Sequence, residues 1–345
     1  MTYTYPPSSD QVLPMPVSPN EHSMNDSLLP YLELKIHPLL QFSTIKEVDV
    51  IGDFNRSEGI SWKEKQGKLF NFMRPTVIVQ GEYARVHCFP GWDYVFHFSN
   101  IIKSFYSISN LHTQVNCILP TEQECWRGIE SSSLQKLPFI DTIIMGNVEG
   151  ISFISADEHW QGQGEFLWKI CQIRSGSAIL LGCKHTYWGE IAGRIVSYLS
   201  QRGAQRIIYS GKLGSLDPLH IPNQSLATGD VSLLPNGTSV NWHNMFNNLT
   251  DERVNYGTHI TVPSVLQETV SWIQTQTTKT KFVDPEIGHM AQAAAKSGIE
   301  FAYLHTISDN LARKYLFDLS NERRDQVLTD RRKLYQFIGN AILNL

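Results

Sequence analysis

Three short stretches in the second half of the chain contain residue types that could do chemistry. Residues 211–215 (GKLGS) contain two glycines, which allow a tight turn whose backbone N–H groups could face an anion. Glu286 opens an Ala-rich segment, and Asp309 directly follows an apolar one. Each stretch also has a simpler interpretation. The glycines can form only a turn, Glu286 can be a carboxylate favoured by a helix dipole, and Asp309 can be a helix N-cap.

The elements around these stretches predict an α/β fold with a largely parallel sheet. Apolar segments bounded by glycine predict strands, and the longer amphipathic segments between them predict helices. Ligands collect at the carboxyl ends of strands in such sheets, so the residues that follow each strand form the candidate site. The predicted strands are 177–183, 206–211 and 299–308, and the predicted helices are 188–204, 261–276 and 285–298.

The first half of the chain is harder to interpret. Residues 46–54 predict a short buried strand, and residues 76–89 predict a strand pair bent at Gly81. Six of the sixteen prolines fall in the first 30 residues among Ser, Asn and Asp, so we expect residues 1–35 to form a flexible arm. Residues 91–174 are aromatic-rich without a clear period. They are expected to be an insertion that caps a pocket, forms an interface, folds as a small domain or only decorates the fold.

Composition excludes several classes of protein. The 345 residues carry a net charge of -4 with scattered basic residues, which gives no general drive towards nucleic acid. Five cysteines without a C-x-x-C pair favour a reducing compartment over a disulfide framework, and no apolar run is long enough for a membrane span. We therefore expect a cytoplasmic protein. The twelve histidines show no metal-binding spacing, so no metal site is predicted.

Four segments, considered together, resemble the nucleoside phosphorylase family of purine nucleoside phosphorylases, uridine phosphorylases and methylthioadenosine/S-adenosylhomocysteine nucleosidases. They are YSGKLGSL (209–216), ATGDVSLL (227–234), FVDPEIGHMAQAAAKSGI (282–299) and LHTISDN (304–310). The 23 residues from Glu286 to Asp309 match the spacing expected of the family and are the most specific signal. The resemblance implies a three-layer α/β/α sandwich with a twisted mixed central sheet. It would comprise residues 36–90 and 175–345, interrupted by the insertion.

The resemblance also implies roles for individual residues. Asp309 would be the general acid that protonates the departing purine, and Arg323, fourteen residues later, would assist it. Glu286 would accept hydrogen bonds from the ribose hydroxyls. Pro285 stands where the family usually has Met under the ribose. In the family an aromatic ring often stacks on the base from the segment that corresponds to 256–268, which here offers only Tyr256, His259 and Val265. No cofactor is implied, and inorganic phosphate would be the co-substrate.

The segment upstream is similar to that of the hexameric bacterial purine nucleoside phosphorylases, whose first strand ends in G-D-P-x-R. The corresponding residues here are Gly52, Arg56 and Arg74, with His37 where that subgroup lends a histidine to the neighbouring subunit. Arg74 is also understandable as a residue lent across an interface, so we expect a homo-oligomer, a dimer or a trimer of dimers. The residues implied to hold phosphate are Gly52, Arg56, Arg74, Gly211 and Lys212.

One departure from the family leaves the reaction open. The family's phosphorylases carry Arg two residues before Gly211 and Ser directly after it, whereas this chain has Tyr209 and Lys212. Lys can hold phosphate as a point charge but lacks the bidentate fork of Arg. The leading interpretation is phosphorolysis of a purine nucleoside to free base and ribose 1-phosphate. The alternatives are hydrolysis of a nucleoside or an adenosyl thioether, and a non-catalytic nucleoside-binding or assembly protein.

Overall fold

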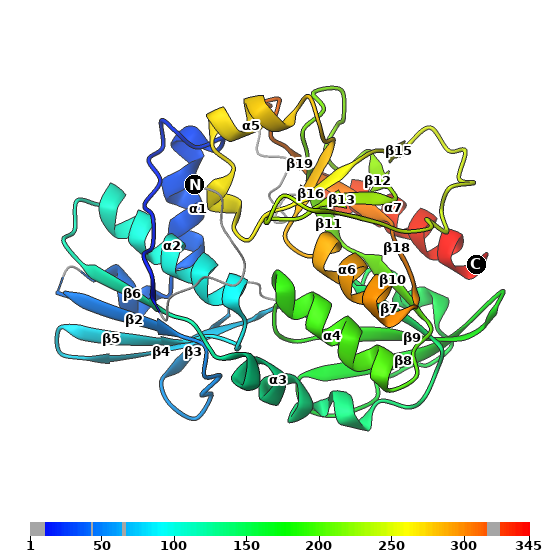
Figure 1. The fold of residues 1–345 in the computed structure, drawn as a ribbon, viewed down its shortest axis with the longest axis horizontal. Helices are drawn as coiled ribbons and strands as arrows, with labels where there is room; N and C mark the ends of the chain where they lie inside the picture. The colour runs from blue at the N-terminus through cyan, green and yellow to red at the C-terminus, as the bar shows by residue number, and fades with distance from the viewer. Residues whose placement is uncertain (1–10, 43, 64–66, 316–324) are drawn as a thin grey trace.

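Residues 11–42, 44–63, 67–315 and 325–345 are described by the structure, which is a computed structural model. They form three β-sheets of six, five and eight strands (Figure 1). Every strand of the six-stranded sheet precedes residue 119, and every strand of the other two sheets follows residue 141. The chain is therefore divided cleanly between one unit around the first sheet and a second unit around the other two.

The six-stranded sheet lies on the left in Figure 1, with α1 (Leu28–Lys35) and α2 (Trp92–Ile108) above it. Its central strands β6, β2 and β5 are parallel, and β4 and β3 continue the sheet as antiparallel strands. In spatial order its strands are β1 (Gln11–Val12), β6 (Gln114–Ile118), β2 (Glu47–Ile51), β5 (Tyr83–His87), β4 (Met73–Gln80) and β3 (Ile60–Lys63).

Two continuous chain segments each contribute one strand to both of the other sheets. Only Gly211 separates β10 from β11, and only Leu304 separates β18 from β19. The five-stranded sheet has the order β18 (Glu300–Tyr303), β10 (Arg206–Ser210), β7 (Thr142–Gly146), β9 (Gly176–Cys183) and β8 (Phe166–Ile173). The eight-stranded sheet has the order β14 (Ser239–Asn241), β13 (Val231–Leu233), β16 (His259–Thr261), β17 (Phe282–Asp284), β11 (Lys212–Ser215), β19 (His305–Asn310), β12 (Leu226–Thr228) and β15 (Val254–Tyr256).

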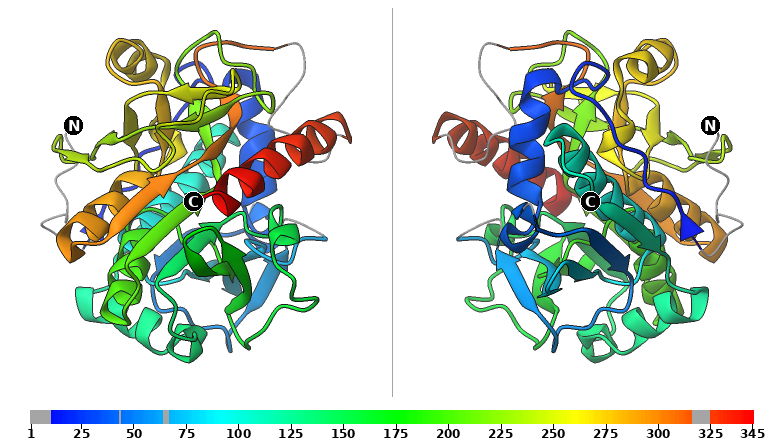
Figure 2. Two further views of the ribbon diagram at one scale, coloured as in Figure 1. Left: turned by 90° about the vertical axis from the view of Figure 1, so that its right-hand side faces the viewer. Right: turned by 90° about the vertical axis from the view of Figure 1, so that its left-hand side faces the viewer.

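Helices cover both faces of the five-stranded sheet. Successive residues of a strand point to opposite faces, so Ile207 joins the core under α4 (Glu190–Gln201) and α6 (Ile287–Ser297). Ile208 joins the second core, under α7 (Asp325–Leu343). Figure 2 shows α6 in orange and α7 in red on opposite sides of the green strands. This arrangement confirms the predicted three-layer α/β/α architecture.

The helix predicted over 261–276 is shorter in the structure. Thr261 ends strand β16, and α5 (Val270–Gln276) begins only after Thr269, whose side chain accepts a hydrogen bond from the Trp272 amide. The apolar spacing alone predicts one continuous helix. Pro263 and the N-cap at Thr269 instead delay the start of the helix. The other short helices are α3 (Glu122–Glu130), η1 (Asn25–Ser27), η2 (Pro38–Gln41), η3 (Ser133–Lys136), η4 (Ser152–Ile154) and η5 (Val265–Gln267).

Residues 91–174, predicted as an insertion, are divided between the two units. They supply α2 and β6 to the first unit, and β7 and β8 to the five-stranded sheet. Part of the predicted flexible arm is also packed, because Leu28 and Leu32 of α1 are fully buried. Their i, i+4 spacing places both leucines on the face of α1 that lies against α2. Burial of these two leucines therefore orders α1, although the preceding segment is rich in proline.

Two helix N-termini face each other where the two units meet. The Glu190 carboxylate at the start of α4 accepts hydrogen bonds from the amides of Trp92 (2.6 Å) and Asp93 (3.1 Å) at the start of α2. Asp93 in turn accepts from the Glu190 amide (3.0 Å). Each carboxylate therefore caps the opposing helix. Only glycine fits at 189, because its φ is +64° and a Cβ there would lie 2.2 Å from Asp93.

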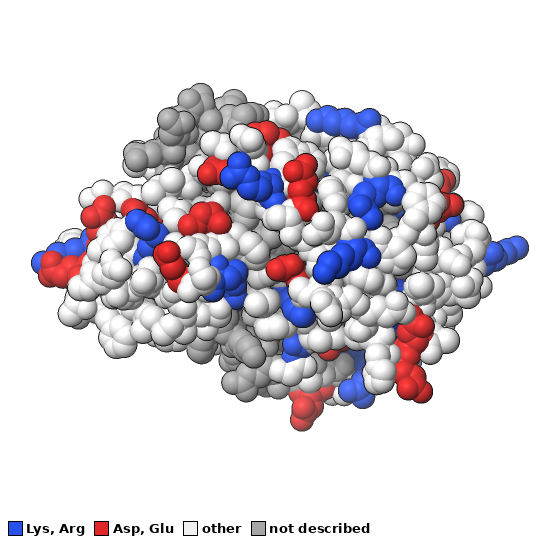
Figure 3. Space-filling model, turned by 90° about the horizontal axis from the view of Figure 1, so that it is seen from below, with Lys and Arg blue, Asp and Glu red and all other residues white. Residues whose placement is uncertain are grey.

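Charged side chains of both signs are interspersed on the face of the molecule in Figure 3. None of the helices in the described ranges has both the length and the apolar character that crossing a membrane requires.

Replacing Asp93 with Ala is expected to lower the free energy of unfolding by about 2 to 4 kcal/mol, because the buried Glu190 amide loses its acceptor and the His289 ring loses the carboxylate 3.2 Å away. Urea titration measures this. The matched control is Glu82→Ala at the exposed Lys46–Glu82 ion pair, which is expected to change stability by less than about 0.5 kcal/mol. Equal losses in the two variants would contradict this interpretation of the interface.

Burial and the nearby Asp93 raise the pKa of Glu190 to about 7, although Arg194, the Trp92 amide and His289 oppose this. The folded state therefore holds this proton more tightly than the unfolded state. Its contribution to stability is present below pH 4.5 and is lost as the pH rises through 7. Glu190→Gln is expected to remove this decline, which urea titrations at pH 5 and pH 8 would measure. An unchanged difference between the two pH values would contradict the assignment.

Candidate functional site

Strand β11 lies between the elements that carry the two candidate carboxylates. It pairs with β17 on one side and with β19 on the other, so that Gly214 is aligned with both Val283 and Asp309. Glu286 follows β17 at the start of α6. The two carboxylates predicted to act together therefore stand on either side of one strand.

A β-bulge sets the direction of Asp309. Leu213 pairs with Ile307 and Gly214 pairs with Asp309, which leaves Ser308 as the extra residue. The Ser308 hydroxyl donates to the Asp309 carboxylate (2.6 Å). A Cβ placed on Gly214 would lie 2.6 Å from the Leu311 Cδ1 atom and 3.2 Å from Asp309 Oδ2, so glycine is required here by the close packing of Leu311 beside this carboxylate. Bulges commonly re-aim a side chain in this way.

The Glu286 carboxyl is buried among aromatic and backbone groups. The Tyr209 hydroxyl donates to its Oε2 atom (3.3 Å), and the Gly189 amide also faces it. Burial and the neighbouring Asp284 raise the pKa of Glu286 well above its usual range. A neutral carboxyl can donate one hydrogen bond and accept others, which suits a pair of hydroxyl groups on a ligand.

Asp284 holds Glu286 in place. Its Oδ1 atom accepts hydrogen bonds from the amides of Glu286 (3.0 Å) and Ile287 (2.9 Å), which caps α6. His259 Nε2 lies 3.0 Å from the same oxygen, and His305 Nε2 lies 3.8 Å from the other. Burial alone would raise the pKa of Asp284, but the two histidines and the helix amide lower it. Asp284 is therefore the charged member of a buried cluster behind Glu286.

Sequence reasoning missed Asp284 and His305 and considered His259 only for the base pocket. An Asp directly before a Pro-Glu helix start is a recognisable N-cap, so Asp284 could have been found. His259 also contacts the Ser232 hydroxyl (2.9 Å), which completes a Ser–His–Asp chain. All three side chains are buried, and Asp284 is used as a cap. This chain therefore supports α6 rather than forming a nucleophile.

The predicted anion-binding turn is engaged by a side chain. The Gly211 amide donates to His305 Nδ1 (3.2 Å), and a Cβ on Gly211 would lie 2.8 Å from His305 Nε2. The glycine is thus required by close packing of the imidazole, which corrects the expectation that its amide faces an anion. Lys212 begins β11, where it is half-buried and in register with Thr306.

Two other residues predicted to hold phosphate belong to the first unit. Gly52 follows β2 and packs against Pro120, whose ring a Cβ would meet at 2.7 Å. Arg56 donates to the Arg74 carbonyl (2.7 Å) and to the Ser61 hydroxyl (2.7 Å). Gly52 and Arg56 therefore belong to the first unit, although Arg56 lies close enough to the loop 184–189 to contribute, after burial, to the lowered pKa of His185. Their G-D-x-x-R pattern ends a strand of the first unit, outside the two sheets that carry Glu286 and Asp309.

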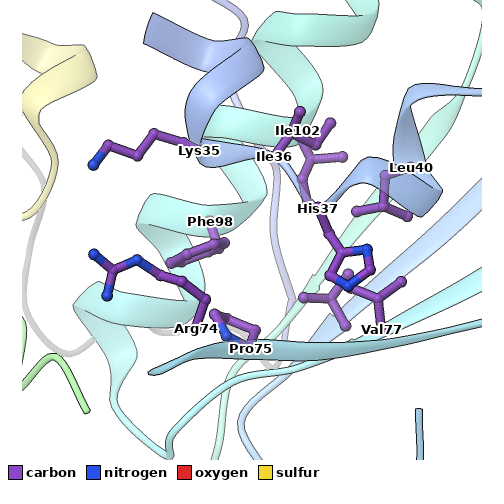
Figure 4. Close-up of a pocket in the computed structure, with 10 residues that line it drawn as sticks. Lys35, Ile36, His37, Leu40, Arg74, Pro75, Val77, Phe98 and Ile102 are labelled. Atoms are coloured by element: carbon purple, nitrogen blue, oxygen red, sulfur yellow. The ribbon is translucent and has the colours of Figure 1, made fainter. Parts of the chain in front are cut away.

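Arg74 and His37 line the same pocket within a single chain. Arg74 donates to Thr186 (2.8 Å) in the loop 184–189, whose last residue, Gly189, faces Glu286. His37 caps η2 by accepting from the Leu39 amide. Figure 4 shows both residues lining a pocket in the first unit, with the charged ends of Arg74 and Lys35 pointing to the same side. Arg74 thus reaches the loop 184–189 within one chain. The expectation that Arg74 is lent across a subunit interface stays a prediction.

The remaining predicted residues are less informative. Val265 begins η5, and its carbonyl oxygen lies 2.9 Å from His22 Nε2. Pro285 is buried between Asp284 and Glu286. Arg323 lies outside the described residues. Within the described ranges, no group of three or more His, Cys, Asp or Glu side chains could hold a metal ion.

No model of a known protein family matches the chain. Among curated proteins the chain is similar to "Oxidoreductase cns1" of Cordyceps militaris, with 25% identity over 277 residues. The match covers 69% of this chain and 35% of that protein, so the chain spans about a third of the length of the curated relative it matches.

Among solved structures, the chain is similar to the 5′-methylthioadenosine/S-adenosylhomocysteine nucleosidase of Campylobacter jejuni, with a TM-score of 0.46 and 13% identity over 59% of this chain and 98% of that one. It is also similar to the uridine phosphorylase of Vibrio fischeri, with a TM-score of 0.48 and 12% identity over 59% and 90% of the two chains. It is similar as well to the futalosine hydrolase of Helicobacter pylori, with a TM-score of 0.45 and 13% identity over 59% of this chain and 96% of that one. The expected closeness to hexameric bacterial purine nucleoside phosphorylases stays a prediction.

Proposed function

We propose that the protein cleaves the N-glycosidic bond of a nucleoside, with Glu286 holding the ribose hydroxyls and Asp309 protonating the departing base. The observation that carries this proposal is the position of the two carboxylates on either side of β11. Glu286 contacts Tyr209 before the strand, and Asp309 is level with Gly214 within it.

The two carboxylates would act at different points of the reaction. Cleavage of the bond leaves positive charge on the sugar and negative charge on the base. A proton delivered by Asp309 would neutralise the base, and general acid catalysis of this kind is worth about 10²–10⁴-fold. A neutral Glu286 would fix the sugar by its hydroxyl groups without adding a second negative charge to the cavity.

The contacts of the predicted phosphate ligands favour water over phosphate as the acceptor. The Gly211 amide is bonded to His305, and Arg56 is bonded within the first unit. Tyr209 occupies the position where the resembling phosphorylases carry an arginine, and its hydroxyl is directed to Glu286. Hydrolysis is therefore the leading reaction.

Phosphorolysis of a purine nucleoside to free base and ribose 1-phosphate is the second candidate. One observation favours it: the Arg74 guanidinium reaches Thr186 in the loop that faces Glu286. A guanidinium can bind phosphate through two parallel hydrogen bonds. In both reactions the catalytic unit would begin at β7, rather than combining residues 36–90 with residues 175–345, because all strands flanking the carboxylates follow residue 141.

A panel of purine and pyrimidine nucleosides, assayed for free base with and without phosphate, tests the reaction. Hydrolysis predicts equal release of base in the two buffers, because water is then the acceptor. Release that strictly requires phosphate, and that Arg74→Ala abolishes, would establish phosphorolysis instead. Binding without release of base from any nucleoside would contradict catalysis.

Substitutions of the two carboxylates separate their roles. Asp309→Asn is expected to lower kcat by about 10²–10⁴-fold, because the amide has no proton to transfer. Glu286→Ala is expected to lower kcat/KM, whereas Glu286→Gln should retain more activity because the native carboxyl is neutral and the amide has a similar shape. The control is Asp251→Asn at the half-buried ion pair with Arg253. Steady-state kinetics that show Asp309→Asn equal to this control would rule out Asp309 as the acid.

A further inference from the structure

The rings expected to contact the base are used elsewhere. The segment 256–268 was expected to supply an aromatic contact, and it offers Tyr256 and His259. The Tyr256 hydroxyl donates to the carbonyls of Phe246 (2.5 Å) and Leu249 (3.1 Å). His259 is fully buried beside Asp284. His259 is therefore covered, and Tyr256 lies on β15 at the edge of the eight-stranded sheet, away from β17 and Glu286. An aromatic contact beside Glu286 would have to come from another segment.

Trp188 occupies a suitable position in the loop 184–189. It directly precedes Gly189, whose amide faces the Glu286 carboxyl, and it follows Tyr187, whose pKa is raised by burial. The Trp188 side chain is only half-buried, so part of the indole surface remains available for contact. Trp188 is thus one residue from the backbone amide that faces the carboxyl proposed to hold the sugar.

The Trp188 ring is held in one orientation by two contacts. Its Nε1 atom donates to the Pro263 carbonyl (2.8 Å). The ring of His97, on α2 in the first unit, stacks on it with centroids 4.1 Å apart and an angle of 15° between the planes. Rotation of the indole about either side-chain torsion would break the hydrogen bond and the stack together.

His97 is itself fixed by the segment that Trp188 contacts. His97 is 3% exposed, and its Nδ1 atom lies 2.8 Å from the Ser264 hydroxyl. His97, Trp188 and the segment 263–264 therefore form a closed set of contacts. The set joins α2 of the first unit to two segments of the second unit that border the candidate site.

We propose that Trp188 is an aromatic contact of the bound nucleoside, and that His97 is the positioning residue that holds its ring. This inference rests on the proposed function. It assigns the first unit a role in substrate binding through α2, in addition to packing. An indole face suits a flat base or the apolar face of a sugar, and it would act mainly on binding rather than on the chemical step.

Steady-state kinetics on any nucleoside that the wild-type protein cleaves tests the proposal. Trp188→Ala is expected to raise KM about threefold to tenfold, which corresponds to the loss of one aromatic contact. The kcat of this variant should stay within about twofold of the wild-type value. His97→Ala should raise KM in the same direction. His97→Phe, which keeps a ring for stacking, should restore KM towards the wild-type value. The control is Trp126→Phe, a half-buried tryptophan on α3.

The outcomes separate this inference from the proposed function. Cleavage by the wild type, together with Trp188→Ala and Trp126→Phe proteins of equal KM, overturns the role of Trp188 and leaves the function intact. Absence of cleavage by the wild type on every nucleoside overturns the function and this inference with it. If His97→Ala does not fold, His97→Phe and His97→Asn are compared instead. Equal KM values for these two variants overturn the positioning role, because only the first keeps a ring that can stack.

Discussion

The buried charge of Asp284 is the constraint on which the candidate site depends. One of its oxygens caps α6 and thereby sets where Glu286 begins the helix. The same carboxylate lies between two buried histidines, and one of these, His305, takes the hydrogen bond of the Gly211 amide. Because a buried charge is tolerated only with partners, the helix start, the imidazoles and the turn must be satisfied together. The site is therefore specified by a cluster rather than by separate residues.

The interface between the two units follows a similar rule. Asp93 and Glu190 each cap the helix that begins with the other, so neither N-terminus is complete without its neighbour. Arg194 extends this contact by binding Glu122 of α3 through two hydrogen bonds of 2.6 and 2.8 Å and by lying over the ring of Trp92. The loop 184–189 ends within this interface. Its position beside Glu286 is consequently set by both units.

Much of the second unit could be predicted from its sequence. The apolar spacing of 206–211 and the Gly-terminated helix that ends at Gly298 correspond to β10 and α6. The pairing of Glu286 with Asp309 depended on their spacing, and both flank β11. The phosphate residues could not be predicted in this way. Gly52 and Arg56 have the residue types of a known pattern, but only strand pairing shows that their sheet is a different one. The Ser308 bulge and the His305 contact are likewise products of tertiary packing, which a sequence pattern does not record.

The clean division of strands has a consequence for biosynthesis. A ribosome makes a chain from its N-terminus, and a unit can fold once its own residues have emerged. Every strand of the six-stranded sheet is available before the first strand of the other sheets is translated. The earlier unit can therefore be assembled as a preformed surface, with the α2 helix exposed, on which the later loop 184–189 and its tryptophan come to rest.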